Sequence, residues 1–184
     1  MNAENMRVRV TKRMLREGLL RCLKHTSIDK LSVSELCRES GVNRATFYNH
    51  YEIPKDILME IGMEYADEIK RIFESSTKLP ISEKLAHCLE VLYNNKETIK
   101  IIYGSGSDQH LTNVSSDIFM WIWGQVGDIV KKLNLKHDAD YELVAYAMGM
   151  GVYNLVKIWL TEDVDRTPSE IADILLMLTK KIFL

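Results

Sequence analysis

Hydrophobic residues recur at spacings of three and four along almost the whole chain. No segment of strand length alternates apolar and polar residues, so the pattern predicts an all-α protein. Thr11 is the expected N-cap of a first helix that runs to about His25. The apolar face of this helix is formed by Leu15, Leu19, Cys22 and Leu23.

Two short helices with a tight turn between them are predicted next. Ser32 and Glu35 have the spacing of a capping box, and the helix that they start stops at Ser40-Gly41. Asn43 is the expected cap of a second short helix that runs through Asn49. Two helices joined by a glycine-containing turn are typical of a helix-turn-helix, whose second helix enters the major groove of DNA.

The remaining two thirds of the chain also read as helices. Pro54 starts a long helix to about Ser75. Further helices are expected over 82–93, 96–103, 114–133, from Asp138 or Asp140 to about Leu160, and from Pro168, capped by Thr167, to the C-terminus. The helix over 114–133 has two apolar stripes, which predicts burial on two sides.

Charge is distributed unevenly between the two ends of the chain. The net charge is -2, but residues 1–51 carry +5 and residues 52–184 carry -7. A basic N-terminal segment suggests contact with nucleic acid or another anionic surface, although a solvated basic face would look the same. An acidic partner protein is the rival interpretation.

A helical wheel of the second short helix separates an inner face from an outer one. Phe47 and Tyr51 point inward, while Ala45, Thr46 and Asn49 lie at the centre of the exposed arc. Arg44 and Tyr48 flank that arc. These small or hydrogen-bonding side chains suit phosphates and base edges better than an acidic solvent face would.

The segment LSVSELCRESGVNRATFYNHY, residues 31–51, resembles the TetR family of transcriptional regulators, and the similarity covers about residues 10–60. The resemblance implies a three-helix DNA-binding domain over 1–53 and a helical effector-binding and dimerisation domain over 54–184. It implies a cytoplasmic homodimer on a palindromic operator, acting as a repressor that a small-molecule effector can release. An activator, or a regulator controlled by a protein partner, is the alternative.

The resemblance also assigns roles within the motif. Thr46, Tyr48 and His50 correspond to phosphate-contacting positions, and Ser32 adds the N-terminus of the preceding helix. Base reading is implied for Asn43, Arg44 and Asn49, with Ala45 beside them. The family usually has a phosphate-clamping lysine at the position of Pro54, so Lys55 is the candidate substitute.

Two features of the C-terminal part suggest a ligand and a partner subunit. Trp123, Tyr146 and Met150 are candidate walls of an apolar effector pocket, with ordinary core packing as the alternative. Small residues lie four apart in the pairs Ala145 with Gly149 and Ala147 with Gly151, which allows close helix approach. The last two helices are therefore the expected dimer interface.

Other function classes find little support in the sequence. The three cysteines are isolated and the histidines are scattered, so neither a disulfide framework nor a metal site is expected, and no cofactor is implied. No catalytic motif is recognisable, so an enzyme is not expected. The longest uncharged apolar stretch, Leu143 to Val156, has 14 residues and is too short to cross a bilayer.

Overall fold

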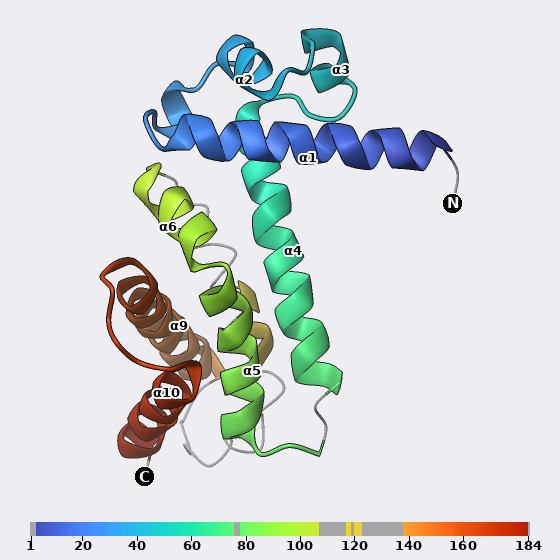
Figure 1. The fold of residues 1–184 in the computed structure, drawn as a ribbon. Helices are drawn as coiled ribbons and strands as arrows, with labels where there is room; N and C mark the ends of the chain where they lie inside the picture. Colours follow the sequence, from blue (N-terminus) through green and yellow to red (C-terminus); the bar gives the residue numbers. More distant parts are fainter. Residues whose placement is uncertain (1–2, 76–77, 107–116, 119, 123–137, 184) are drawn as a thin grey trace. The chain divides into compact units, whose positions relative to one another are not determined.

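The computed structural model describes residues 3–75, 78–106, 117–118, 120–122 and 138–183, and the regular structure in these ranges is helical (Figure 1). The all-α prediction is confirmed. The elements are α1 Ala3–Leu23, the short 3-10 helix η1 Ile28–Lys30, α2 Val33–Ser40, α3 Arg44–Tyr48, α4 Pro54–Ser75, α5 Ile81–Asn94, α6 Lys96–Gly104, α9 Asp138–Thr161 and α10 Pro168–Phe183.

The first helix starts earlier than the sequence predicted. Thr11 is not its cap, because α1 begins at Ala3 and Thr11 lies in its interior. The early turns carry Met6 and Val10, which are 50% and 40% exposed. These turns bury little apolar surface, and the row of buried residues begins only at Leu15. The predicted start of the helix is therefore too late. Of the predicted helix over 114–133, only 117–118 and 120–122 are described, and they are helical.

Contacts divide the chain into two compact units. The first comprises Met1–Gly62 with Glu97–Asp108, and the second comprises Met63–Lys96 with Gln109–Leu184. The division falls within α4, so this helix contributes residues to both units. The functional boundary at residues 53 and 54 stays a prediction, since compactness alone does not show which segment works by itself.

The core of the first unit lies between α1, α2 and α3. Leu15, Leu19, Leu36 and Phe47 are fully buried in it. α1 and α2 approach so closely at Gly18 that a Cβ there would stand 2.6 Å from the Ser40 Cβ. Close packing on α1 therefore fixes the position of the two short helices, which Figure 1 shows side by side above α1.

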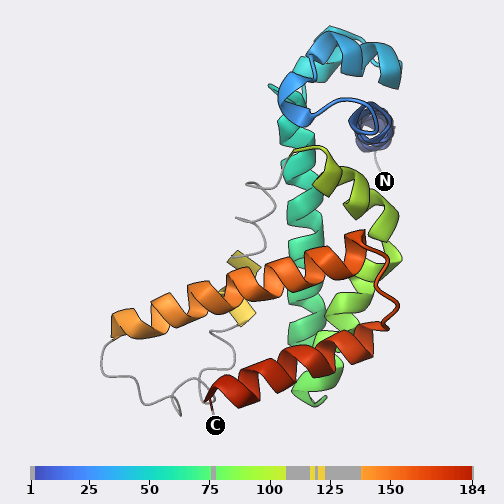
Figure 2. The same ribbon diagram turned by 90° about the vertical axis from the view of Figure 1, so that its left-hand side faces the viewer.

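In the second unit, α10 packs against α5 and crosses it (Figure 2). A small core there contains Ile69, Phe73 and Cys88, and the rings of Trp121 and Phe73 form a T-shaped pair with 5.7 Å between centroids. Burial raises the pKa of the Cys88 thiol to about 11. This cysteine is therefore a packing residue and carries no thiolate at neutral pH.

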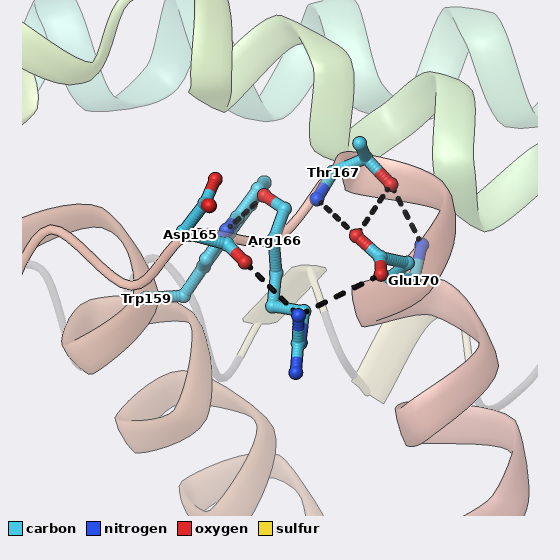
Figure 3. A network of polar contacts seen from close by, with 5 residues as sticks. All are labelled: Trp159, Asp165, Arg166, Thr167 and Glu170. Atoms are coloured by element: carbon cyan, nitrogen blue, oxygen red, sulfur yellow. Dashed lines mark hydrogen bonds and ion pairs between the residues drawn. The ribbon is translucent and has the colours of Figure 1, made fainter.

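A set of polar contacts fixes the corner between α9 and α10 (Figure 3). The indole Nε1 of Trp159 donates to the Arg166 carbonyl at 2.9 Å. Thr167 and Glu170 form a capping box, in which the Thr167 N–H donates to Glu170 at 2.8 Å and the Glu170 N–H donates to Thr167 Oγ1 at 3.3 Å. The predicted cap at Thr167 is confirmed.

One helix of the described residues is long and apolar enough to cross a membrane by length and composition alone. It is Asp140–Thr161 in α9, and one third of its most apolar window is buried within the protein. Core helices of water-soluble proteins share these properties, so the feature is weak support for a membrane span.

Candidate nucleic-acid interface

Side-chain caps hold both short helices as the sequence predicted. At the start of α2, the Glu35 N–H donates to Ser32 Oγ at 3.2 Å and the Ser32 N–H donates to the Glu35 carboxylate at 3.1 Å. These hydrogen bonds from Ser32 hold the pKa of Glu35 below its usual value. At α3, the Thr46 N–H donates to Asn43 Oδ1 at 2.8 Å. The start of each helix is thus fixed locally.

Gly41 makes the turn between α2 and α3. Its φ of 73° lies in the left-handed region, where side chains other than glycine are strained. Its N–H donates to the Cys37 carbonyl at 3.0 Å and closes the end of α2. Val42, buried directly after the turn, then directs the chain into α3.

The two neighbouring aromatic residues of α3 face opposite environments. Phe47 is fully buried, whereas Tyr48 is 54% exposed. Arg44, Ala45 and Asn49 are exposed as well, whereas Thr46, predicted at the centre of the outer arc of α3, is half-buried. This surface offers a guanidinium, a methyl, an amide and a phenol, which together suit DNA phosphates and base edges.

Two of the candidate contacts already serve as caps. Ser32 Oγ donates to the Glu35 carboxylate at 2.7 Å while it accepts the Glu35 N–H, so both functions of the hydroxyl are in use. Asn43 uses Oδ1 for the cap, which leaves its Nδ2 as the group for an outside acceptor. Both residues are exposed.

The other candidates lie at the margin of this surface. Thr46 and His50 are half-buried. Lys55, the candidate substitute for the family's lysine, forms an ion pair with Asp29 at 3.3 Å, and its side chain is 29% exposed. A phosphate would have to compete with the Asp29 carboxylate for this ammonium group.

Tyr51 connects the end of the motif to α4 and α1. Its hydroxyl donates to Glu60 at 2.8 Å, and Lys12 Nζ contacts both carboxylate oxygens of Glu60 at 3.0 Å. Partial burial raises the pKa of Glu60, but the hydrogen bonds from Lys12 and Tyr51 outweigh it, and the net shift is downward. Three segments of the first unit are therefore joined through one carboxylate.

The early start of α1 places in the helix two basic residues that precede the predicted cap at Thr11. Arg7 and Arg9 are both exposed on α1. The signal that could have placed them was the spacing of Met6, Val10 and Met14, four residues apart, which continues the helix before Thr11.

The described residues include two of the three predicted effector residues, Tyr146 and Met150, which lie one helical turn apart on α9. Trp123 lies outside the described residues, Tyr146 is 62% exposed and Met150 is half-buried. A cleft of about 410 Å³ between α4 and α5 is lined by Glu68, Ile72, Ser75, His87, Glu90, Val91, Asn94 and Asn95. Neither Tyr146 nor Met150 contributes to it.

The outward face of α9 is mostly apolar, and over residues 143–158 no exposed side chain is charged. Between residues 143 and 158 the exposed side chains are Leu143, Tyr146, Ala147, Gly151, Asn154 and Ile158, which we call the α9 face. The pair Ala145 and Gly149 is buried within the protomer instead. Of the two small-residue pairs, only Ala147 with Gly151 is available to a partner.

Comparison with solved structures relates the whole fold to known proteins. The TetR transcriptional regulator from Streptococcus agalactiae 2603V is 20% identical with a TM-score of 0.67, and the match covers 97% of this chain and 99% of that one. The fatty acid degradation regulator FadR from Bacillus halodurans is 14% identical with a TM-score of 0.64, over 92% and 94%. The dihydroxyacetone kinase operon activator DhaS is 12% identical with a TM-score of 0.58, over 94% and 96%. These identities show a shared fold.

The sequence comparison identifies the family. No curated protein matches the chain. The TetR-family model described as "Transcriptional regulator C-terminal region" matches residues 81–181, which is more than half of the chain. The chain therefore belongs to the TetR family, whose members are transcriptional regulators and not enzymes.

Proposed function

We propose that the protein is a cytoplasmic, homodimeric repressor that binds a palindromic operator through α3. The observation that carries this proposal is the outer arc of α3, where Arg44, Ala45, Tyr48 and Asn49 are exposed while Phe47 anchors the helix in the core. A short recognition helix reads few base pairs, so two copies related by a two-fold axis would supply the needed contacts.

Each exposed group has a role that its chemistry supports. Arg44 and Asn49 would read base edges, with the guanidinium suited to guanine and the amide to adenine. Ala45 offers a methyl group for contact with thymine. Thr46, Tyr48 and His50 would donate to phosphates, and these contacts set orientation more than sequence preference. Ser32 at the N-terminus of α2 would do the same once its O–H leaves the Glu35 carboxylate.

Asn43 and Lys55 need some rearrangement to contribute. Asn43 would donate from Nδ2 while Oδ1 keeps the cap of α3. Lys55 would exchange Asp29 for a phosphate, and loss of this surface ion pair costs little because Asp29 remains well solvated at 67% side-chain exposure.

For the dimer interface we propose the last two helices, with the α9 face against the same face of a second copy. An exposed strip without charge over 143–158 is costly to leave in water, and Ala147 with Gly151 would allow the two helices to approach closely. Met177 and Leu178 on α10, which are 46% and 40% exposed, would extend the apolar contact. This arrangement is an intermolecular four-helix bundle.

An apolar small molecule bound within residues 81–160 would act as the effector in this proposal, with Trp123, Tyr146 and Met150 among the walls of its site. Binding there would change the distance between the two recognition helices and so release the operator. A second candidate function is activation of transcription. It is supported by the structural similarity to DhaS, which is named as an operon activator.

The experiment is fluorescence anisotropy with the promoter DNA beside the protein's own gene. Arg44→Ala should weaken binding to this DNA by about 1–3 kcal/mol per half-site and relax base preference at one position. Arg71→Ala is the matched control. It removes the same charge, but Arg71 is exposed on α4 in the second unit. Equal affinity of the two variants would contradict the assignment of α3 as the reader.

A further inference from the structure

One side of α1 contacts successive parts of the helix-turn-helix along its length. Arg21 Nε contacts the Glu39 carboxylate at 2.7 Å. The next residues along are Gly18, which lies against Ser40, and Met14, whose Cε would be 3.7 Å from a Cβ on Gly41. As α1 is followed toward its N-terminus, its partners therefore advance from the end of α2 into the turn that leads to α3.

Arg7 continues this row beyond the turn. It precedes Met14 by seven residues, which is about two helical turns, so the two residues share a face and lie roughly 10 Å apart along the axis. The chain that follows Gly41 leads into α3, which starts at Arg44. Figure 1 shows the N-terminal end of α1 running on past α3, and both elements belong to the first unit.

The guanidinium of Arg7 is available for an outside ligand. Arg7 is exposed, and no ion pair joins it to a side chain in the described part of the chain. Arg21, on the same face, is by contrast occupied by Glu39. An arginine that is held on a rigid helix, exposed and next to a recognition helix is suited to a phosphate, which it can contact with two parallel hydrogen bonds.

We propose that Arg7 contacts a DNA phosphate that flanks the bases read by α3. This inference rests on the proposed function, since it requires α3 to lie on DNA. The site is a second, sequence-independent contact made by α1, and it fixes the register of the motif on the duplex.

Arg9 provides a matched control on the same helix. It is also exposed, but two residues correspond to about 200° around the helix axis, so Arg9 lies on the side of α1 away from the row of Arg7 and Met14. Arg9→Ala and Arg7→Ala remove the same charge from the same turn of α1. Only the direction of the side chain differs.

The test measures the affinity for the promoter DNA and for unrelated duplex DNA at several salt concentrations. Arg7→Ala should weaken both by about tenfold or more, and reduce the slope of log affinity against log salt by about 2, one contact per protomer of the dimer. Arg7→Lys should restore the slope, and Arg9→Ala should keep the slope of the unsubstituted protein.

Equal slopes for Arg7→Ala and Arg9→Ala would overturn the inference. The outcome for Arg44→Ala separates this failure from that of the proposed function. If Arg44→Ala abolishes operator binding while Arg7→Ala behaves like Arg9→Ala, only the Arg7 contact is wrong. If the unsubstituted protein does not bind DNA at all, the proposed function is wrong and the Arg7 contact fails with it.

Discussion

Gly18 on α1 and Ser40 on α2 are in backbone-level contact. A Cβ on Gly18 would lie 2.6 Å from the Ser40 Cβ, 2.9 Å from its Cα and 3.0 Å from its nitrogen. Those atoms belong to the backbone or its first substituent and cannot move aside without moving α2. The position of the helix-turn-helix on α1 thus depends on the absence of a side chain at residue 18.

Gly18→Ala should destabilise the protein for this reason. Alanine favours a helix over glycine by about 1 kcal/mol, but forcing the two helices apart costs about 1–3 kcal/mol. We expect a lower free energy of unfolding in urea denaturation. Gly104→Ala is the control, because nothing lies within 4 Å of a Cβ there; a loss of stability as large as that of Gly18→Ala would contradict the packing argument.

Phe47 and Tyr48 should give opposite results on substitution. Phe47→Ala removes a fully buried ring and should cost about 3–5 kcal/mol of stability. Tyr48→Ala removes a side chain that is 54% exposed and should leave a folded dimer with weakened DNA binding. Circular dichroism with an electrophoretic mobility shift distinguishes the two, and unfolding of Tyr48→Ala would show that Tyr48 belongs to the core.

Substitution of the outward and the inward alanine of α9 should have different effects. Ala147 is exposed, so Ala147→Arg should place a charge in the proposed dimer interface and give folded monomers by light scattering. Ala145 is 1% exposed, so Ala145→Arg should instead unfold the second unit. An Ala147→Arg variant that stays dimeric at low concentration would move the interface away from the α9 face.

Acid should weaken the link between Tyr51, Lys12 and Glu60. The pKa of Glu60 in the folded protein lies below its usual 4.5, so its stabilising effect is present above that pH and is lost as the pH falls through the lower, folded value. Denaturation at a series of pH values should show a smaller acid-induced loss for Glu60→Gln than for the unsubstituted protein. Parallel curves would mean that this carboxylate contributes nothing to the pH dependence.

The sequence predicted the elements whose ends carry local chemistry. Ser32 with Glu35, Asn43 and Thr167 all cap helices where expected, because capping depends on residues three apart. Helical periodicity correctly predicted that Ala45 and Asn49 are exposed on α3, but it also placed the half-buried Thr46 at the centre of the exposed arc. Phe47 and Val42 are buried, and this fixes which side of α3 faces the core and which side faces solvent.

Features that depend on packing between distant segments were harder to predict. The first turns of α1 bury little apolar surface, so Thr11 was mistaken for a cap. Ala145 and Ala147 belong to equivalent small-residue pairs in the sequence, and only the tertiary structure shows that the first is inside and the second outside. The ion pair between Lys55 and Asp29, which are 26 residues apart, also has no pattern in the local sequence that would predict it.

The most direct test of the central claim is the selection of binding sites from random duplex DNA by the purified protein, followed by sequencing. A homodimer that reads DNA through α3 should enrich an inverted repeat whose half-sites are centred one helical turn of DNA, or a multiple of it, apart. Arg44→Ala should lose preference at one symmetric pair of positions. Enrichment of no sequence, or of a single unrepeated half-site, would contradict a homodimeric regulator that reads DNA through α3.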